Sequence, residues 1–261
     1  MILEDFHVHS TYCDGKNSLE EMVRAAVDMK MTRLGFSGHA YTFFDGTYCM
    51  TKEDTLRYAE DIAELKEKYK DKIQILCGLE LDYFSDEPNI ETDYLLGSVH
   101  YVKAGEKYCE VDNSAAVMAS DVERYFDGDY YAYAKEYFAL VGDVINKTKA
   151  DIIGHFDLIT KFNEGNKMFD TESPDYIAAA KAAIDNLIPH NKPFEINKGA
   201  MSRGYRTEAY PEMQFLKYIK EKGGRVILSG DTHAAENLCY RFEEYERIAK
   251  DMGFDNIIFK K

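Results

Sequence analysis

Residues 73–80, with the sequence Ile-Gln-Ile-Leu-Cys-Gly-Leu-Glu, form an almost continuous apolar run that ends in a carboxylate. Apolar runs of this length are typical of strands buried on both faces, as in parallel sheets. Segments of the same kind predict seven strands, with an eighth, weaker candidate last: Ile2–Val8, Arg33–Ser37, Ile73–Glu80, Tyr94–Val99, Ala150–Gly154, Pro193–Asn197, Arg225–Ser229 and Asn256–Phe259.

Helical patterns lie between these segments. Ser18-Leu19-Glu20-Glu21 is a capping box and predicts a helix that extends to about Met31. Further helices are expected after Thr51, after Ser173-Pro174, after Pro211, around 129–147 and over Ala235–Met252. Strand followed by helix about seven times predicts an α/β protein with a parallel sheet, either a nearly closed barrel or an open doubly wound sheet.

Composition narrows the classes of function. The chain has 261 residues, a net charge of −15 and a hydrophobic fraction of 45%, which is ordinary for a globular protein. This acidity argues against nucleic acid and anionic membranes as partners, although it leaves room for a small phosphorylated substrate. Five widely spaced cysteines and the lack of a signal pattern predict a reduced, cytoplasmic protein.

Histidines gather at the ends of the expected strands. Since the carboxyl ends of parallel strands meet on one face of a barrel, side chains there are expected to lie together. Glu80 and Asp231 occupy the same kind of position. Imidazole and carboxylate groups are ligands for divalent ions such as Zn, Fe and Mn. The histidines at strand ends are His7, His9, His39, His100, His155 and His233, whereas His190 falls on the opposite face.

The ordered motifs resemble those of the PHP (polymerase and histidinol phosphatase) superfamily, most closely its histidinol-phosphate phosphatases. They are Asp5-Phe6-His7-Val8-His9-Ser10, Gly38-His39, Gly78-Leu79-Glu80, Gly97-Ser98-Val99-His100-Tyr101, Gly154-His155-Phe156-Asp157 and Ser229-Gly230-Asp231-Thr232-His233. The resemblance runs from Ile2 to about Leu238. It implies a distorted (β/α)7 TIM-like barrel, with residues 1–261 as a single domain and a metal site at the carboxyl ends of the strands.

The resemblance also implies a ligand set for two to three divalent ions. His7, His9, Glu80 and Asp231 would hold the first ion. Glu80, His100 and His155 would hold the second, with Glu80 bridging. Asp14, His39 and His233 would hold the third, and Asp14 departs from relatives that carry histidine at its position. Three such ions would change the net charge from −15 to about −9.

The implied reaction is hydrolysis of L-histidinol phosphate to L-histidinol and phosphate, in histidine biosynthesis. A hydroxide that bridges two ions would attack phosphorus. The expected catalytic residues are Glu80, Asp231 and His233, and either of the last two could protonate the leaving group. Arg203 is the preferred phosphate ligand because guanidinium matches phosphate in a bidentate manner, with Lys161 and Arg206 as weaker candidates.

Other interpretations remain open from the sequence. Asp157, Tyr12 and Tyr205 are candidates to receive the amine and imidazole of the substrate. A phosphoesterase acting on a nucleotide or on nucleic-acid ends is the first alternative. A metal-binding regulatory module without turnover is the second, and a metal-dependent amidohydrolase is the third. The sequence does not fix the native metal or the oligomeric state.

Overall fold

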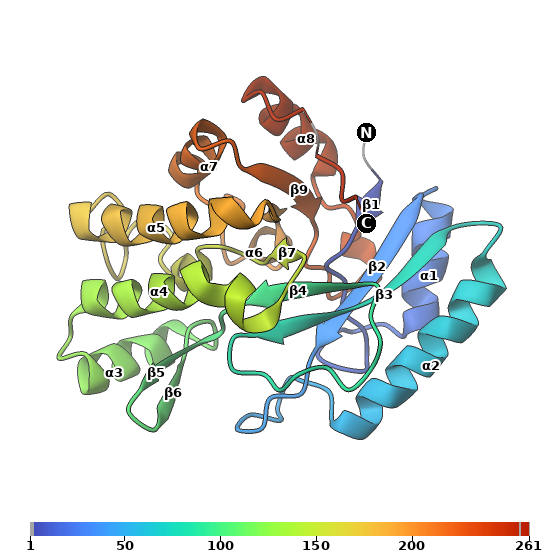
Figure 1. Ribbon diagram of the computed structural model, residues 1–261, viewed down its shortest axis with the longest axis horizontal. Helices are drawn as coiled ribbons and strands as arrows, with labels where there is room; N and C mark the ends of the chain where they lie inside the picture. Colours follow the sequence, from blue (N-terminus) through green and yellow to red (C-terminus); the bar gives the residue numbers. More distant parts are fainter. Residues whose placement is uncertain (1–2, 256, 261) are drawn as a thin grey trace.

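The computed structural model describes residues 3–255 and 257–260. Seven strands form one parallel sheet, in the same order as in the sequence (Figure 1). The strands are β1 (Glu4–Asp5), β2 (Arg33–His39), β3 (Gln74–Asp82), β4 (Tyr94–Ser98), β7 (Ile152–Ile153), β8 (Pro193–Asn197) and β9 (Arg225–Ser229). The seven principal strand predictions are confirmed, with β1 and β7 shorter than expected.

The two edge strands of the sheet approach each other, so the barrel is nearly closed. Val8 forms an isolated parallel bridge with Thr232. The amide of His9 donates to the carbonyl of Thr232 at 2.9 Å. Asp5 of β1 accepts from the amide of Gly230, directly after β9, at 3.0 Å. These contacts confirm the barrel and exclude the open doubly wound sheet.

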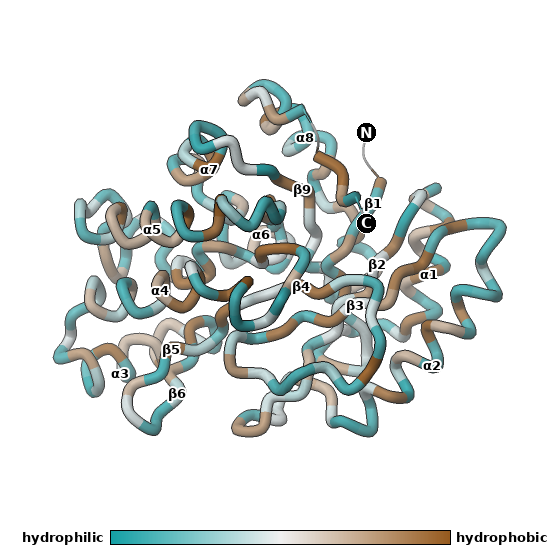
Figure 2. The backbone as a smooth tube through the Cα atoms, viewed as in Figure 1, coloured by the Kyte–Doolittle hydropathy of each residue, from teal (hydrophilic) through white to brown (hydrophobic). Residues whose placement is uncertain are grey.

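The helices surround the strands, and hydrophobic and hydrophilic residues alternate along those that face the sheet (Figure 2). Ser18 accepts from the amide of Glu21 and the side chain of Glu21 accepts from the amide of Ser18, which confirms the capping box. The helices are α1 (Leu19–Asp28), α2 (Lys52–Tyr69), α3 (Ala115–Tyr125), α4 (Tyr130–Thr148), α5 (Pro174–Leu187), α6 (Gly199–Ser202), α7 (Met213–Glu221) and α8 (Phe242–Asp251).

Several connections differ from the prediction. No helix joins β3 to β4, so strand and helix do not alternate seven times. An antiparallel hairpin of β5 (Tyr101–Ala104) and β6 (Lys107–Glu110), which was not predicted, follows β4. The expected helix Ala235–Met252 is confirmed over α8 (Phe242–Asp251), but its start is wrong: residues 235–237 form a 3₁₀ turn, and Cys239 and Arg241 adopt φ values of 52° and 53°, which separate that turn from α8.

The remaining deviations lie near the ends of two elements. Pro211 precedes the N-cap residue Glu212, so it lies outside the first turn of α7. Of the weak strand candidate Asn256–Phe259, Asn256 lies outside the described residues and residues 257–259 form no strand. Instead, the ring of Phe259 packs 5.1 Å from that of Phe6 and closes the amino end of the barrel.

The core follows from this arrangement. One large group of buried side chains joins α4, α5 and α7 to the later strands, and a second joins α1 and α2 to β2 and β3. Within the described part of the chain, no helix combines the length and apolar character needed to cross a bilayer. The packed helices leave the carboxyl ends of the strands as the face on which polar side chains collect.

Candidate active site

All nine side chains expected from the sequence lie together at the carboxyl end of the barrel. His7 and His9 directly follow β1, and His39 is the last residue of β2. Glu80 lies within β3. His100, His155 and Asp231 follow β4, β7 and β9. Asp14 comes from the loop that precedes α1, and His233 follows Asp231 by two residues. Residues as far apart as 7 and 233 therefore form one cluster.

Glu80 occupies the centre of this cluster and is 1% exposed. Its Oε2 lies 2.9 Å from His7 Nε2 and 3.2 Å from His39 Nδ1. Its Oε1 lies 2.9 Å from His155 Nε2 and 3.4 Å from His100 Nε2. Burial alone raises the pKa of this carboxyl, but the charges of His7 and His39 outweigh it and hold the pKa well below its ordinary value.

Asp14 organises a second group on the solvent side of Glu80. Its two oxygens lie 3.3 Å from His9 Nδ1, 3.7 Å from His39 Nε2 and 3.0 Å from His233 Nε2. The rings of His9 and His233 stack at 4.1 Å. One donor atom from each of these four residues lies within 4.8 Å of the donor atoms of the other three. The aspartate at position 14 thus occupies the place expected of a ligand.

The donor set fits divalent metal ions. Three overlapping groups have donor atoms within 4.8 Å of one another: His9, Asp14, His39 and His233; His7, His9 and Glu80; His39, Glu80 and His100. The buried Nε2 of His9 has no hydrogen-bond partner among the described residues, although oxygens of Glu80 and Asp231 lie 3.5 and 3.6 Å away. Such close but unbonded donors are what a shared cation would satisfy. The structure also places His39 beside Glu80. The family resemblance had implied that His39 binds the third ion alone.

Sequence reasoning missed the residues that hold these donors from behind. Glu195 Oε1 lies 2.8 Å from His7 Nδ1, and its Oε2 accepts from the amide of His155 at 3.0 Å. Asp82 accepts from the amide of His100 at 2.7 Å. Carboxylates that orient ligand imidazoles are common around metal centres. Glu195 could have been found by the criterion applied to Glu80, because it too interrupts an apolar strand.

A cavity of about 180 Å³ opens above the cluster. Arg203 reaches it from the turn after α6, where its Nη1 lies 2.6 Å from His233 Nδ1 and its Nη2 lies 3.3 Å from Asp231 Oδ2. Lys161 also lines this cavity and pairs with Asp112 at 3.0 Å. The full lining is Asp14, His39, Glu80, His100, Asp112, His155, Leu158, Lys161, Arg203, Tyr205, Asp231 and His233.

Arg206 does not line this cavity, contrary to the sequence expectation. It is 8% exposed, and its Nη1 donates to the carbonyl of Thr160 at 3.1 Å. Its Nη2 lies 3.5 Å from Glu212 Oε1. Two residues suggested for the organic part of a substrate are also elsewhere: Asp157 is fully buried, and Tyr12 donates to Asp61.

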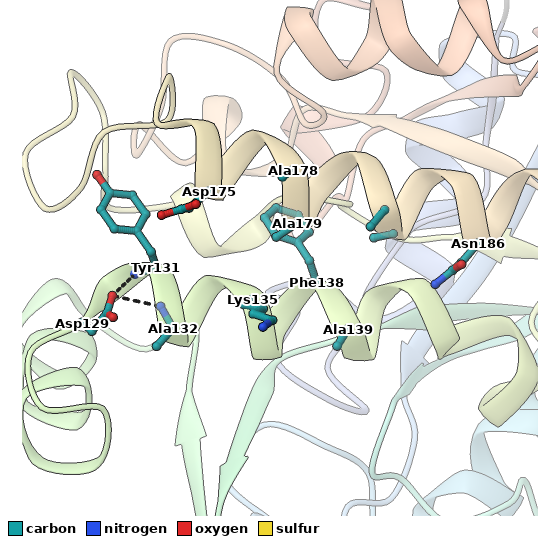
Figure 3. Close-up of a pocket in the computed structure, with 12 residues that line it drawn as sticks. Asp129, Tyr131, Ala132, Lys135, Phe138, Ala139, Asp175, Ala178, Ala179 and Asn186 are labelled. Atoms are coloured by element: carbon teal, nitrogen blue, oxygen red, sulfur yellow. Dashed lines mark hydrogen bonds between the residues drawn. The ribbon is translucent and has the colours of Figure 1, made fainter.

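A larger hollow lies between α4 and α5. It measures about 700 Å³ and contains none of the nine donor residues (Figure 3). Alanines such as Ala139 and Ala179 leave space between the two helices, and Asp129 caps α4 by accepting from the amides of Tyr131 and Ala132. This hollow is a packing groove without converging polar groups, so the chemistry lies in the smaller cavity.

A nearly closed parallel barrel whose strand ends gather imidazoles and carboxylates defines a class of metal-binding α/β barrels. The chain belongs to the PHP domain family, whose model matches residues 5–199. Asp231 and His233 follow the matched segment and complete the cluster.

Relatives along nearly the whole chain carry related names. A Deinococcus radiodurans protein named "Probable histidinol-phosphatase" is 26% identical, with 98% of this chain and 96% of that protein covered. The histidinol-phosphatase of Bacillus subtilis is 24% identical, with 92% and 97% covered. The histidinol phosphate phosphatase of Lactococcus lactis, solved with Zn, L-histidinol and phosphate, has a TM-score of 0.73 at 21% identity, with 97% and 95% covered.

Proposed function

We propose that this protein is a metal-dependent phosphomonoesterase that hydrolyses L-histidinol phosphate to L-histidinol and phosphate. One observation carries the proposal: a cluster of six histidines and three acids opens into a cavity that also contains Arg203 and Lys161. Metal ligands beside two cationic side chains suit a phosphoryl group. The names of the full-length relatives support the choice of substrate.

Two to three divalent ions, of Zn, Fe or Mn, are proposed to bind at the nine donors. His7, His9, Glu80 and Asp231 form the deepest set, and Glu80 is shared with His100 and His155 on its other oxygen. Asp14, His39 and His233 form the set nearest the solvent, joined by His9. Bound ions would supply an activated water and neutralise charge on the phosphoryl oxygens.

The protein side chains would divide the remaining work. Arg203 already points its guanidinium at Asp231 and His233, so it would hold a phosphoryl oxygen beside those two residues. Lys161, fixed by Asp112, would also hold the phosphate. Asp231 or His233 would pass a proton to the leaving alcohol, because both border the cavity. The cavity volume of about 180 Å³ suits a small ester.

The same structure supports two broader parts of the proposal. We infer a single domain over residues 1–261, since all seven barrel strands belong to one sheet. The five cysteines form no disulfide, which supports the cytoplasmic location expected from the sequence.

A panel of phosphomonoesters tests the function directly. The protein, loaded with Zn, Fe or Mn in separate samples, is assayed for phosphate release from L-histidinol phosphate, nucleoside monophosphates and 4-nitrophenyl phosphate. We expect the highest kcat/KM for L-histidinol phosphate, by a factor of at least about 100 over the generic ester. Equal values for all esters would overturn the proposed substrate, and no release from any of them would favour a non-catalytic role.

A further inference from the structure

A second cavity, of about 170 Å³, adjoins the one that contains the metal ligands. The two cavities share Asp14, His39, His100 and Asp112 in their walls, so they adjoin each other at these residues. The other walls of the second cavity are Asp45, Thr47, Tyr48, Tyr101, Glu110 and Asn113.

The two cavities differ in their cationic side chains, although both also contain carboxylates, of which Asp14, Glu80 and Asp231 in the first are proposed metal ligands. The first contains Lys161 and Arg203, which suit an anion. The second has no lysine or arginine in its described lining, and its walls include three carboxylates beyond Asp14: Asp45, Glu110 and Asp112. A molecule with a phosphate at one end, held by these cations and by the proposed metal ions, and a cation at the other end would match this difference.

The β5–β6 hairpin and the loop after β2 form walls of the second cavity, and a hydrogen bond joins these two segments. In the β5–β6 hairpin, Tyr101 lies directly opposite Glu110. The hydroxyl of Tyr101 donates to Asp45 Oδ2, on the loop after β2, at 2.7 Å. From the same loop, the ring of Tyr48 lies edge-on to His39 at 4.8 Å. Two tyrosine rings and a carboxylate therefore border the space beside the proposed metal ligands.

The hydrogen bonds distinguish among the three carboxylates. Asp45 is occupied by Tyr101 on one oxygen and by Thr47 on the other. Asp112 is paired with Lys161. Glu110 accepts only from the side-chain amide of Asn113, at 2.7 Å through Oε2, and its other oxygen accepts no hydrogen bond from the described residues. Glu110 is thus the acid in this cavity with an oxygen available to a ligand.

We propose that the second cavity binds the cationic end of the substrate alcohol, with Glu110 as the partner of its ammonium or imidazolium group and Tyr48 and Tyr101 as flanking rings. This inference rests on the proposed function. A charge-assisted hydrogen bond to Glu110 and contact of the cation with the ring faces would both favour a cationic alcohol over a neutral one. Glu110 would then determine specificity without contacting the phosphoryl group.

Three phosphate esters of similar size test the inference. L-Histidinol phosphate has an amine and an imidazole, L-phenylalaninol phosphate keeps only the amine, and 3-phenylpropyl phosphate has neither. The measured quantity is kcat/KM for each cationic ester divided by that for 3-phenylpropyl phosphate. We compare the metal-loaded wild-type protein with Glu110→Gln, which keeps the size of the side chain, and with Glu106→Gln, an exposed glutamate in the turn of the same hairpin.

We expect Glu110→Gln to lower the ratio for L-histidinol phosphate about tenfold, and Glu106→Gln to leave it unchanged. The ratio for L-phenylalaninol phosphate shows which cation Glu110 contacts, since it falls only if that group is the amine. If the wild-type ratio is already near one, the proposed substrate is wrong. If the wild type prefers the cationic esters and Glu110→Gln keeps that preference, or Glu106→Gln loses it equally, the second cavity is not the binding site.

Discussion

Glu80 is the single residue on which the site depends most. Its two oxygens contact four histidines from different strands, and Ser98 Oγ donates to Oε1 at 2.6 Å. A carboxylate buried to this degree in an apolar strand is stable only with cationic or hydrogen-bonding partners. Glu80 therefore links the fold, through β3, to the binding of metal.

Substitution of Glu80 tests that link. Glu80→Gln keeps the shape of the side chain and removes the charge, so we expect at least one fewer ion per chain and a fall in kcat of more than about a hundredfold. Elemental analysis and phosphate release measure the two effects, and circular dichroism reports the fold. Glu87→Gln, an exposed glutamate, is the matched control. Unchanged metal content in Glu80→Gln would remove Glu80 from the ligand set.

Lys198 is a second residue with a measurable signature. It is fully buried, donates to the carbonyl of Ile196 at 2.9 Å and lies 4.0 Å from the centre of the Phe242 ring. Burial lowers its pKa to about 7, and the charges of Asp5 and Cys239 oppose the shift only in part. Between pH 7 and the ordinary pKa of 10.5, the unfolded chain therefore binds more protons at this lysine than the folded chain.

The stability penalty at Lys198 must accordingly shrink as the pH rises from 7 to about 10, by up to about 1.4 kcal/mol per pH unit. We expect Lys198→Met to stabilise the protein most near pH 7 and progressively less at higher pH. Urea unfolding of the variant and of the wild type across this range measures the difference. The exposed Lys217→Met serves as the control, and a difference independent of pH would contradict the buried, shifted lysine.

At the scale of elements, Arg206 joins the turn that presents Lys161 to the turn that presents Arg203, the two proposed phosphate ligands. It connects Thr160, in the 3₁₀ turn before Lys161, with Glu212 at the start of α7, and its guanidinium lies 5.1 Å from the centre of the Tyr210 ring. Arg206, which was predicted from the sequence to bind phosphate, is thus placed to hold the turns that present Lys161 and Arg203.

Arg206→Ala would leave Glu212 without its cationic partner and would separate the two turns. Breaking a buried ion pair of this kind costs about 3 kcal/mol of unfolding free energy. The exposed Arg247→Ala should change stability by less than about 0.5 kcal/mol. Urea unfolding and the KM for phosphate esters are measured together. Normal stability with a raised KM in Arg206→Ala would restore the sequence-based assignment of Arg206 as a phosphate ligand.

How much the sequence predicted depended on the kind of signal. Strand ends such as Gly38-His39 combine a buried apolar run with a polar terminus, so both the strand and the position of its donor could be predicted. For Glu195, inside β8, and Asp82, the last residue of β3, only the register of the barrel shows which ligand each supports. The β5–β6 hairpin and Glu110 carry no periodic pattern, and their place beside the site depends on contacts with the distant loop around Asp45.

At the scale of the whole molecule, the barrel holds an unusual concentration of buried charged and polar donors. Ions bound to the folded site but not to the unfolded chain stabilise the fold, by about 4 kcal/mol when the free ion exceeds its Kd a thousandfold. We expect removal of metal by a chelator to lower the Tm by several degrees, and readdition of Zn or Mn to restore it. A Tm that does not respond, in a sample shown by elemental analysis to lose its metal, would contradict binding at this site.

The bridge between Val8 and Thr232 has a consequence for biosynthesis. The first and last donors of the cluster, His7 and His233, are made at opposite ends of translation, and a ribosome adding about 5–20 residues per second needs roughly 10–45 s to pass from one to the other. During that interval the nascent chain holds an incomplete set of ligands and an open barrel. The complete metal centre can therefore form only near the end of translation or after it, and a prematurely terminated chain that lacks Asp231 and His233 cannot assemble it.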